Sequence, residues 1–443
     1  MNPIKRVWMG LAFAWMTISA NAQTRQLSLD EAVQLGVQNS KQLKLSQNKI
    51  DQATAQWKQT KDAALPTAKV SAGYSHALML TRKFVLPSTD GSNPKTTELP
   101  FDNTLYQGTI SINEPIYAGG KFRYATESAN LLIESAKLDA DKDKDEIVHN
   151  IIQSYINYYK IIQNQKIVAQ NLDDVQQKLT EIKKFEDQGL ATRNDVLRFE
   201  LQKSTIQLQQ LDLENSRKLV NYNLAILLGL PDNTTIQVQD VSYKLDTRDG
   251  PDEFLKQALQ DRKEFASLKY QDKLADLSIK KVKSETMPTV GVGGNLYYFN
   301  LTNNPIPKSG GFLAPFVVGV NVSWDVASLF KNKNKKEEAE LQKQEVMANR
   351  DMLVDKVKMQ VNESYIQYQQ ALDRIKILET AVTQATENER IMESKFKNNL
   401  ATTTDRIDAE SLLYEARLNL ELAKADATAA YYTLQKQTGH IQP

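Results

Sequence analysis

The sequence predicts a mainly α-helical chain with a small β portion, built from two copies of one structural plan. Three observations predict this fold class. The chain has only 17 Gly and 13 Pro in 443 residues, and they are clustered, so very long stretches carry neither. Residues 114–229 align with residues 324–439 without a gap. In four short segments the apolar residues alternate with polar ones, which is the period of a strand.

Residues 1–22 have the features of a signal peptide. Two basic residues, Lys5 and Arg6, precede the apolar run 7–18, and the segment 20–22 (Ala-Asn-Ala) matches a cleavage site. We therefore expect cleavage after this segment and export from the cytoplasm. A membrane anchor is the alternative, but the apolar run is too short to span a bilayer.

The composition excludes several classes of function. No Cys occurs, so the chain has no disulfide framework, no thiolate site and no lipid anchor on a Cys. The balance of 55 basic against 54 acidic residues argues against nucleic acid as a partner. After the signal peptide no apolar run reaches the roughly 18 residues of a transmembrane helix, so we expect no helical membrane span.

The two copies share rare residues at a shift of 210 positions. Ser154-Tyr155-Ile156 matches Ser364-Tyr365-Ile366, and Gly229 matches Gly439. The triplet Leu-Ala-Thr occurs at both 190–192 and 400–402. Chance similarity between two helical segments would not concentrate on Tyr, Gly and loop positions, so we interpret the pattern as a duplication.

Each copy is expected to hold a helix, a β-hairpin, a long helix, a tip loop and a last helix. In the first repeat, 23–229, these lie at 28–64, 66–116, 120–187, 188–194 and 192–228. Residues 230–251 form an equatorial linker. In the second repeat, 252–443, the first helix is expected at 252–286, the hairpin at 288–326 and the tip at 398–404, with a long helix before the tip and a last helix after it. Prolines 66 and 288 end the first helix of each copy.

The four strands have one apolar, aromatic face and one small, polar face. A soluble sandwich would show this pattern, but so would membrane strands with lipid on one side and a lumen on the other. Four strands with long loops make a poor independent sandwich, so we favour the membrane. Four strands cannot close a barrel, and open edges do not survive in lipid. Two chains would give about eight strands with a filled interior, and three would give about 12 strands with a lumen.

The long helix of the first repeat would reach roughly 100 Å at ~1.5 Å per residue. Its apolar residues follow heptad-like spacing, in two stripes that are one residue out of register: Val148, Ile152, Tyr155, Tyr159 and Ile162, then Val168, Leu172, Val175, Leu179 and Ile182. An isolated coiled-coil rod is the alternative. The shift between the stripes favours contacts with neighbouring helices on two sides.

The passage EPIYAGGKFRYA at 114–125 and the loop GLATRNDVL at 189–197 resemble the TolC family of outer-membrane efflux proteins. The duplication and the signal peptide extend this resemblance over the mature chain. It implies a duplicated TolC-like fold. In that fold, four strands per chain contribute to a trimeric 12-stranded outer-membrane β-barrel, continuous with a long periplasmic α-helical barrel.

The resemblance also implies a function. It is that of a homotrimeric exit duct in a tripartite efflux or type I secretion system of a Gram-negative-type cell envelope. Such a duct lies in outer-membrane lipid and conducts passively. Its partners would be a periplasmic adaptor (membrane fusion) protein and an inner-membrane transporter, of RND, ABC or MFS class. A periplasmic coiled-coil scaffold or adaptor without a pore is the alternative, but adaptors usually carry a lipoyl-like or β-barrel module between their helices.

We expect no enzyme activity, no cofactor and no metal site. His76, His149 and His440 lie far apart in a strand, a helix and the tail, without ligand spacing. The acidic residues of the helices are expected mostly on solvated faces.

The two tip loops are the candidate functional residues. Gly189 suits a positive φ, and Thr192 or Thr402 suits a helix N-cap. By the resemblance, Asp405 and Asp408 are the candidate pore acids of a periplasmic gate, and Asp195 is a candidate tip partner. The candidate docking residues for an adaptor are Gly189, Leu190, Ala191, Thr192, Leu400, Ala401 and Thr402.

The chain departs from the family pattern at Ala401 and Phe396, where an Arg and a Tyr can link neighbouring tips. Other contacts must then hold the closed state, and Arg193 and Arg406 are the candidates.

Overall fold

The structure is a computed structural model that describes residues 24–76, 83–86, 91, 93–98, 104–241, 250–300, 304–305, 308–309, 312–398 and 400–442. The expected signal peptide 1–22 lies outside these residues. The chain divides into two compact units. The first unit holds Met1–Leu43, Asp143–Asp261 and Val357–Pro443, and the second holds Lys44–Lys142 and Arg262–Lys356.

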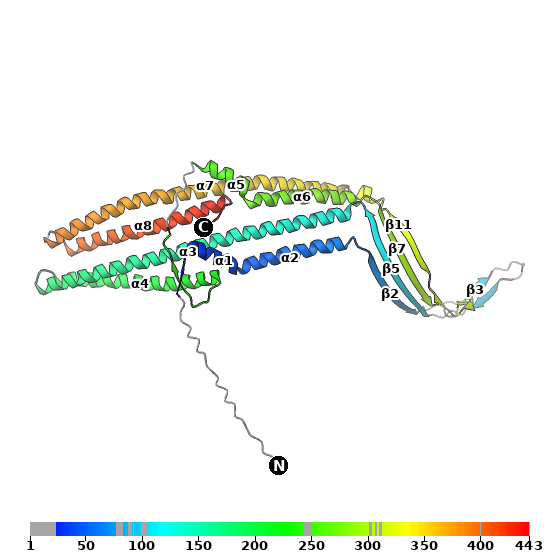
Figure 1. Ribbon diagram of the computed structural model, residues 1–443, viewed down its shortest axis with the longest axis horizontal. Coiled ribbons are helices and arrows are strands. Elements are labelled where there is room, and N and C mark those ends of the chain that lie inside the picture. Colours follow the sequence, from blue (N-terminus) through cyan, green and yellow to red (C-terminus); the bar gives the residue numbers. More distant parts are fainter. Residues whose placement is uncertain are drawn as a thin grey trace, which may run out of the picture. The chain divides into compact units, whose positions relative to one another are not determined.

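The second unit contains one antiparallel sheet of four long strands (Figure 1). The strands are β2 (Thr67–His76), β5 (Thr104–Ala118), β7 (Thr289–Asn300) and β11 (Phe316–Ser323), in that spatial order. The two hairpins expected from the sequence therefore join through β5 and β7. The short strand β10 (Phe312–Leu313) pairs with β7 beyond the start of β11. Two further short pairs are β3 (Lys83–Leu86) with β4 (Lys95–Glu98), and β8 (Asn304–Pro305) with β9 (Lys308–Ser309).

One face of this sheet is apolar and exposed. A single row crosses all four strands through Val70, Ile110, Leu296 and Phe316, whose exposed fractions are 75%, 45%, 38% and 69%. The neighbouring row, which carries Lys69, Ser111 and Asn295, points to the opposite face. Within the described residues, β2 pairs only with β5 and β11 pairs only with β7, so each leaves one edge open.

A glycine turn connects β5 to the long helix α3 (Lys121–Asp187). Gly119 has φ +60°, and a Cβ there would lie 2.6 Å from the Ser284 carbonyl oxygen and 2.7 Å from the Met287 Cβ. Only glycine fits such a position without strain. In the same unit, Lys343 of α7 (Ser328–Lys397) makes an ion pair with Asp276 of α6 (Lys263–Ser284). Lys335 of α7 makes another with Glu285, in the turn after α6.

The expected single helices 28–64 and 252–286 are each two helices. The first is α1 (Leu29–Asn39) and α2 (Lys41–Asp62), and the second is α5 (Pro251–Asp261) and α6. Ser40 and Arg262 have extended backbones at the two breaks. The Ser40 Oγ accepts a hydrogen bond from the Leu43 amide at 3.2 Å and so begins a new helix. Neither break contains Gly or Pro, the residues that most often mark the end of a helix in a sequence.

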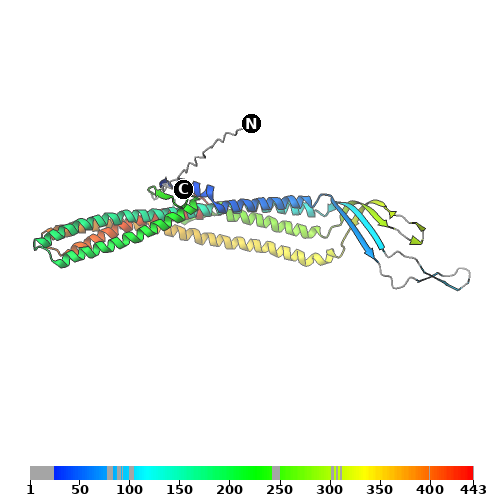
Figure 2. The same cartoon turned by 90° about the horizontal axis from the view of Figure 1, so that it is seen from below.

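In the first unit, α4 (Arg193–Leu228) runs back along the second half of α3, and α8 (Thr403–Gln437) runs back along α7 (Figures 1 and 2). The heptad-like stripes of α3 pack as the sequence predicts. Val148, Ile152, Tyr155 and Tyr159 lie in one buried cluster, and Val168, Val175, Leu179 and Ile182 lie in another. No helix among the described residues is both long and apolar enough to cross a membrane.

The segment 230–251, expected as a polar linker, contains a strand that belongs to the core. This strand, β6 (Thr235–Val238), pairs in parallel with β1 (Thr24–Leu27). The Tyr155 hydroxyl of α3 donates to the Leu27 carbonyl at 2.8 Å and accepts from the Gln239 amide at 2.9 Å. The Tyr158 hydroxyl donates to the Ile236 carbonyl at 3.0 Å. Two tyrosines of the long helix thus fasten a two-stranded sheet to the bundle.

We expect Tyr155→Phe to lower the free energy of unfolding by about 1–2 kcal/mol, because it removes the hydrogen bonds of the hydroxyl to the buried Leu27 carbonyl and to the Gln239 amide, which keep only their mutual bond at 3.3 Å. The measurement is denaturant unfolding of the detergent-solubilised protein, followed by helical circular dichroism. Tyr222→Phe is the matched control, since Tyr222 is 45% exposed. Equal unfolding midpoints for the two variants would contradict this role of Tyr155.

Candidate functional site

The first tip is a short loop closed by a left-handed glycine. Gly189 has φ +73°, and the amides of Leu190 and Ala191 both donate to the Phe185 carbonyl, at 2.8 and 3.2 Å. In the second tip the Leu400 amide makes the corresponding bond to the Lys395 carbonyl at 2.8 Å. The same helix ending therefore recurs in both repeats.

Each last helix begins with a capping box. The Asp195 carboxylate accepts from the Thr192 amide at 2.9 Å and from its hydroxyl at 2.6 Å. The Asp405 carboxylate accepts from the same groups of Thr402 at 2.8 and 2.7 Å. Both threonines are N-caps, as expected. The capping box gives both aspartates a structural role in addition to the one predicted.

The three predicted acids have different surroundings. The amide and hydroxyl of Thr402 lower the pKa of Asp405, so its exposed carboxylate stays ionised. Asp408 is also exposed, one turn further along α8. Burial would raise the pKa of Asp195, but hydrogen bonds from Thr192 and from Thr403 outweigh it and lower the pKa. Thr403 belongs to the second tip, so the pKa of Asp195 depends on both tips of one chain.

The predicted docking residues present an apolar surface at each tip. Leu190 is 64% exposed and Leu400 is 77% exposed. Gly189, Thr192 and Thr402 are exposed, whereas Ala191 and Ala401 are half-buried. Two exposed leucines at the ends of adjacent hairpins suit contact with another apolar surface.

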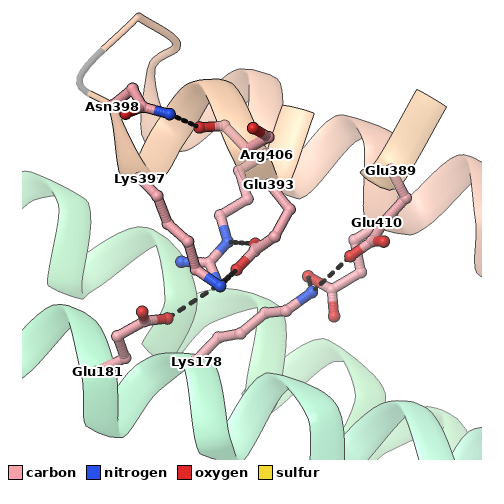
Figure 3. Close-up of polar contacts among 9 residues, drawn as sticks. Lys178, Glu181, Glu389, Glu393, Lys397, Asn398, Arg406 and Glu410 are labelled. Atoms are coloured by element: carbon pink, nitrogen blue, oxygen red, sulfur yellow. Dashed lines mark hydrogen bonds and ion pairs between the residues drawn. The ribbon is translucent and has the colours of Figure 1, made fainter. Parts of the chain in front are cut away.

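A buried arginine, Arg406, lies in the first turn of α8 among acidic residues of the neighbouring helices (Figure 3). Arg406, whose side chain is 3% exposed, makes ion pairs with Glu181 of α3 at 2.8 Å and with Glu393 of α7 at 2.6 Å. Its guanidinium carbon lies 4.7 Å from the centre of the Phe396 ring. Arg406 is one of the two candidates for holding the closed state. Within one chain its ion pairs connect the two repeats.

The other candidate, Arg193, is 63% exposed. It lies 3.9 Å from Glu186 and from Glu200, both of its own hairpin.

A second cation bridges the same three helices. Lys178 of α3 lies 3.4 Å from Glu389 of α7 and 3.2 Å from Glu410 of α8 (Figure 3). Only 7% of the Glu410 side chain is exposed, and this burial raises the pKa of Glu410 despite the nearby Lys178 and Arg406. A small cavity of about 50 Å³ borders this pair.

Sequence analysis missed this charge cluster, although α8 carried a signal for it. Thr403, Arg406, Glu410 and Leu413 are buried at the start of α8 with steps of three, four and three, and Ala409 is buried beside Glu410. Those are the positions of a heptad core, which is normally apolar. Charged side chains at two of them indicate buried ion pairs with another helix.

The histidines are not brought together as one site. The His149 ring contacts the Thr433 hydroxyl at 3.3 Å, and the His440 ring contacts Asp261 at 2.8 Å. Among the residues that the structure describes, no group of three or more His, Cys, Asp or Glu is placed to hold a metal ion.

Comparison with known proteins adds family information to this geometry. The family model described as outer membrane efflux protein matches residues 32–230 and 254–440. The chain is 20% identical over 363 residues to the outer membrane efflux protein BepC of Brucella suis biovar 1 (strain 1330). That match covers 80% of this chain and 77% of BepC.

Solved structures show the same fold at low sequence identity. The outer membrane protein VceC of Vibrio cholerae matches with a TM-score of 0.73 and 17% identity, over 93% of this chain and 96% of VceC. The open state of the MtrE outer membrane channel of Neisseria gonorrhoeae matches with a TM-score of 0.67 and 16% identity, over 93% of this chain and 89% of MtrE.

We expect Lys178→Met to destabilise the protein in a pH-dependent way. Because burial raises the pKa of Glu410, the folded chain holds this proton more tightly than the unfolded chain does. Between the ordinary and the raised pKa, the free energy of unfolding therefore falls as pH rises. Lys178 lowers the pKa of Glu410, so removing this cation raises the pKa further and widens the pH range over which stability falls. The loss should be smaller at pH 5 than at pH 8, because Glu410 binds its proton more readily as the pH falls, and about 3 kcal/mol at pH 8, where an unpaired buried carboxylate remains.

Unfolding of the Lys178→Met variant by denaturant at the two pH values measures this effect. Lys376→Met is the matched control, since its side chain is 75% exposed and pairs only with the nearby Asp373 among the contacts of the described residues. A loss of equal size at pH 5 and pH 8 would show that Glu410 does not carry the effect.

Proposed function

Because the chain belongs to the outer membrane efflux protein family, we propose that three copies of it form a passive exit duct fed by a periplasmic adaptor and an inner-membrane transporter. Members of this family are outer membrane transport channels and not enzymes. The protein is accordingly an outer membrane protein, with its helical part in the periplasm.

The trimer is supported by one observation, the four-stranded sheet with two open edges and an apolar exposed face. In lipid, unpaired backbone groups at a strand edge cost several kcal/mol each, so β2 and β11 require partners. A neighbouring copy supplies them, because β11 of one copy is free to pair with β2 of the next. Closure by three copies gives about 12 strands and a lumen, whereas two copies leave the interior filled by side chains.

The gate of the duct is proposed to lie at the tips. Asp405 and Asp408 are exposed on successive turns of α8, and three copies would bring them together as two stacked acidic rings. Such rings favour cations in a narrow pore. Asp195 contributes differently, as the contact that holds the first tip to Thr403 of the second.

The adaptor is proposed to dock on the exposed tips. Leu190 and Leu400 form the apolar part of this surface, next to the turn at Gly189. The inner-membrane transporter is proposed to select the exported substrate.

The oligomer is tested on the purified protein. We expect heat-stable, SDS-resistant trimers that require detergent and that conduct ions in planar bilayers, because the apolar sheet face must be covered and the edges paired. Gel mobility, light scattering and bilayer currents are the measurements. A water-soluble monomer recovered without detergent would exclude the channel and support the scaffold alternative.

The acidic rings are tested by Asp405→Asn combined with Asp408→Asn. Asparagine keeps the carbonyl oxygen that caps α8 but removes the charge, so the helix is retained. The ratio of cation to anion permeability should fall several-fold, measured as the reversal potential in a salt gradient. Asp232→Asn is the control, because Asp232 is exposed in the loop after α4 and not in a tip. An unchanged reversal potential would remove Asp405 and Asp408 from the pore.

A further inference from the structure

We propose that Arg406 is the latch that holds the two tips of one chain together and keeps the entrance of the duct narrow at rest. This inference rests on the proposed channel function. It names the contact that takes the place of the linking residues expected at positions 401 and 396, which are Ala and Phe in this chain.

Arg406 connects parts of the chain that belong to different repeats. It lies in the first turn of α8 and contacts Glu393 near the end of α7, so it closes its own hairpin. It also contacts Glu181 of α3, through its Nη2 atom at 2.8 Å. Among the charged contacts at the tips in the described residues, this is the one with the most deeply buried cation. Glu181 therefore links the second hairpin to the first, beside the link that Lys178 makes to Glu389 and Glu410.

The surroundings of Arg406 make the contact strong when closed. The Phe396 ring covers the guanidinium at 4.7 Å, and Phe185 of the first hairpin lies 6.4 Å from Phe396. In such a water-poor setting a charge pair is stronger than at the surface, and leaving one partner unpaired is costly. Once the hairpins separate, water solvates the guanidinium and both carboxylates. The contact thus has two arrangements, one with the buried guanidinium paired to two partly exposed carboxylates and one with all three groups separate and hydrated.

Arg406 also sets the rotation of α8. Its side chain lies on the same buried face as Thr403, Glu410 and Leu413. At about 100° per residue, Asp408 lies about 200° around the helix from Arg406. While Arg406 is paired with Glu181, Asp408 is held on the exposed face. Arg406 is therefore a positioning residue for the proposed pore acids and does not itself line the pore.

Because the Lys178 ion pairs remain, the Arg406 guanidinium can be removed without unfolding the tip. Lys178 contacts Glu389 and Glu410 one turn away from the Arg406 contacts and joins the same helices, α3, α7 and α8. A variant that lacks the guanidinium keeps this second bridge and the apolar cluster around Val196 and Phe199. The trimer should still assemble, with hairpins that separate more readily.

The first experiment compares Arg406→Gln, Arg406→Lys and the native protein as SDS-resistant trimers in planar bilayers. Arg406→Gln should raise the single-channel conductance and the frequency of spontaneous opening several-fold. Arg406→Lys restores the charge and should return both values most of the way to native. Arg193→Gln is the matched control, because Arg193 is exposed and contacts only its own hairpin in the described residues. If Arg406→Gln fails to assemble, Glu181→Gln makes the same test, since it leaves Arg406 paired with Glu393.

The second experiment replaces the ion pair by a covalent bridge. The chain has no cysteine, so Glu181→Cys with Arg406→Cys introduces the only two thiols. This variant should open like Arg406→Gln, and a short bis-maleimide joining the thiols should return the conductance to the native value or below. A purely structural role would not give this reversal.

The outcomes separate the latch from the channel. Native trimers that conduct, with Arg406→Gln indistinguishable from Arg193→Gln, would overturn the latch and leave the duct standing. If neither the native trimer nor the Arg406→Gln trimer carries current, the duct is overturned, and the latch with it.

Discussion

The requirement that backbone groups facing lipid be hydrogen-bonded within the protein governs the rest of this structure. One chain supplies only four long strands, and β2 and β11 each keep one edge without a partner in the described residues. The sheet also exposes an apolar row from Val70 to Phe316. An isolated copy therefore satisfies neither the strand edges nor the apolar face. In the proposed trimer, lipid covers the apolar face and neighbouring copies pair the strand edges.

In the proposed duct, the helical part has a different requirement, which is stiffness along its length with an end that can open. Helix α3 is uninterrupted over 67 residues, and its heptad-like stripes pack into two buried clusters. Toward the tips, apolar core positions of α8 are occupied by Arg406 and Glu410. An ion pair needs defined geometry, and water solvates its charges once they separate. In the proposed duct, the buried charges of α8 therefore lie at the end where the hairpins would separate.

The two repeats have diverged where function is expected. Both tips keep the Thr-Asp capping box and the same helix-ending hydrogen bond. The first tip holds its aspartate, Asp195, against Thr403, while the second leaves Asp405 and Asp408 exposed. The duplication therefore repeats the same helix-loop-helix structure, while single residues differ between the two tips. In the first tip they make contacts within the chain, and in the second they belong to the proposed pore.

The sequence by itself determined the features that depend on local or periodic signals. These are the duplication, the four alternating strands, the stripes of α3 and the caps at Thr192 and Thr402. Only the tertiary structure decided three others. The breaks at Ser40 and Arg262 lack Gly and Pro, and β1 pairs with β6 across some two hundred residues. The partners of Arg406 lie on two other helices. A charged residue in a helix is ordinarily solvated, so its burial becomes visible only when the helices that supply the opposite charges are packed around it.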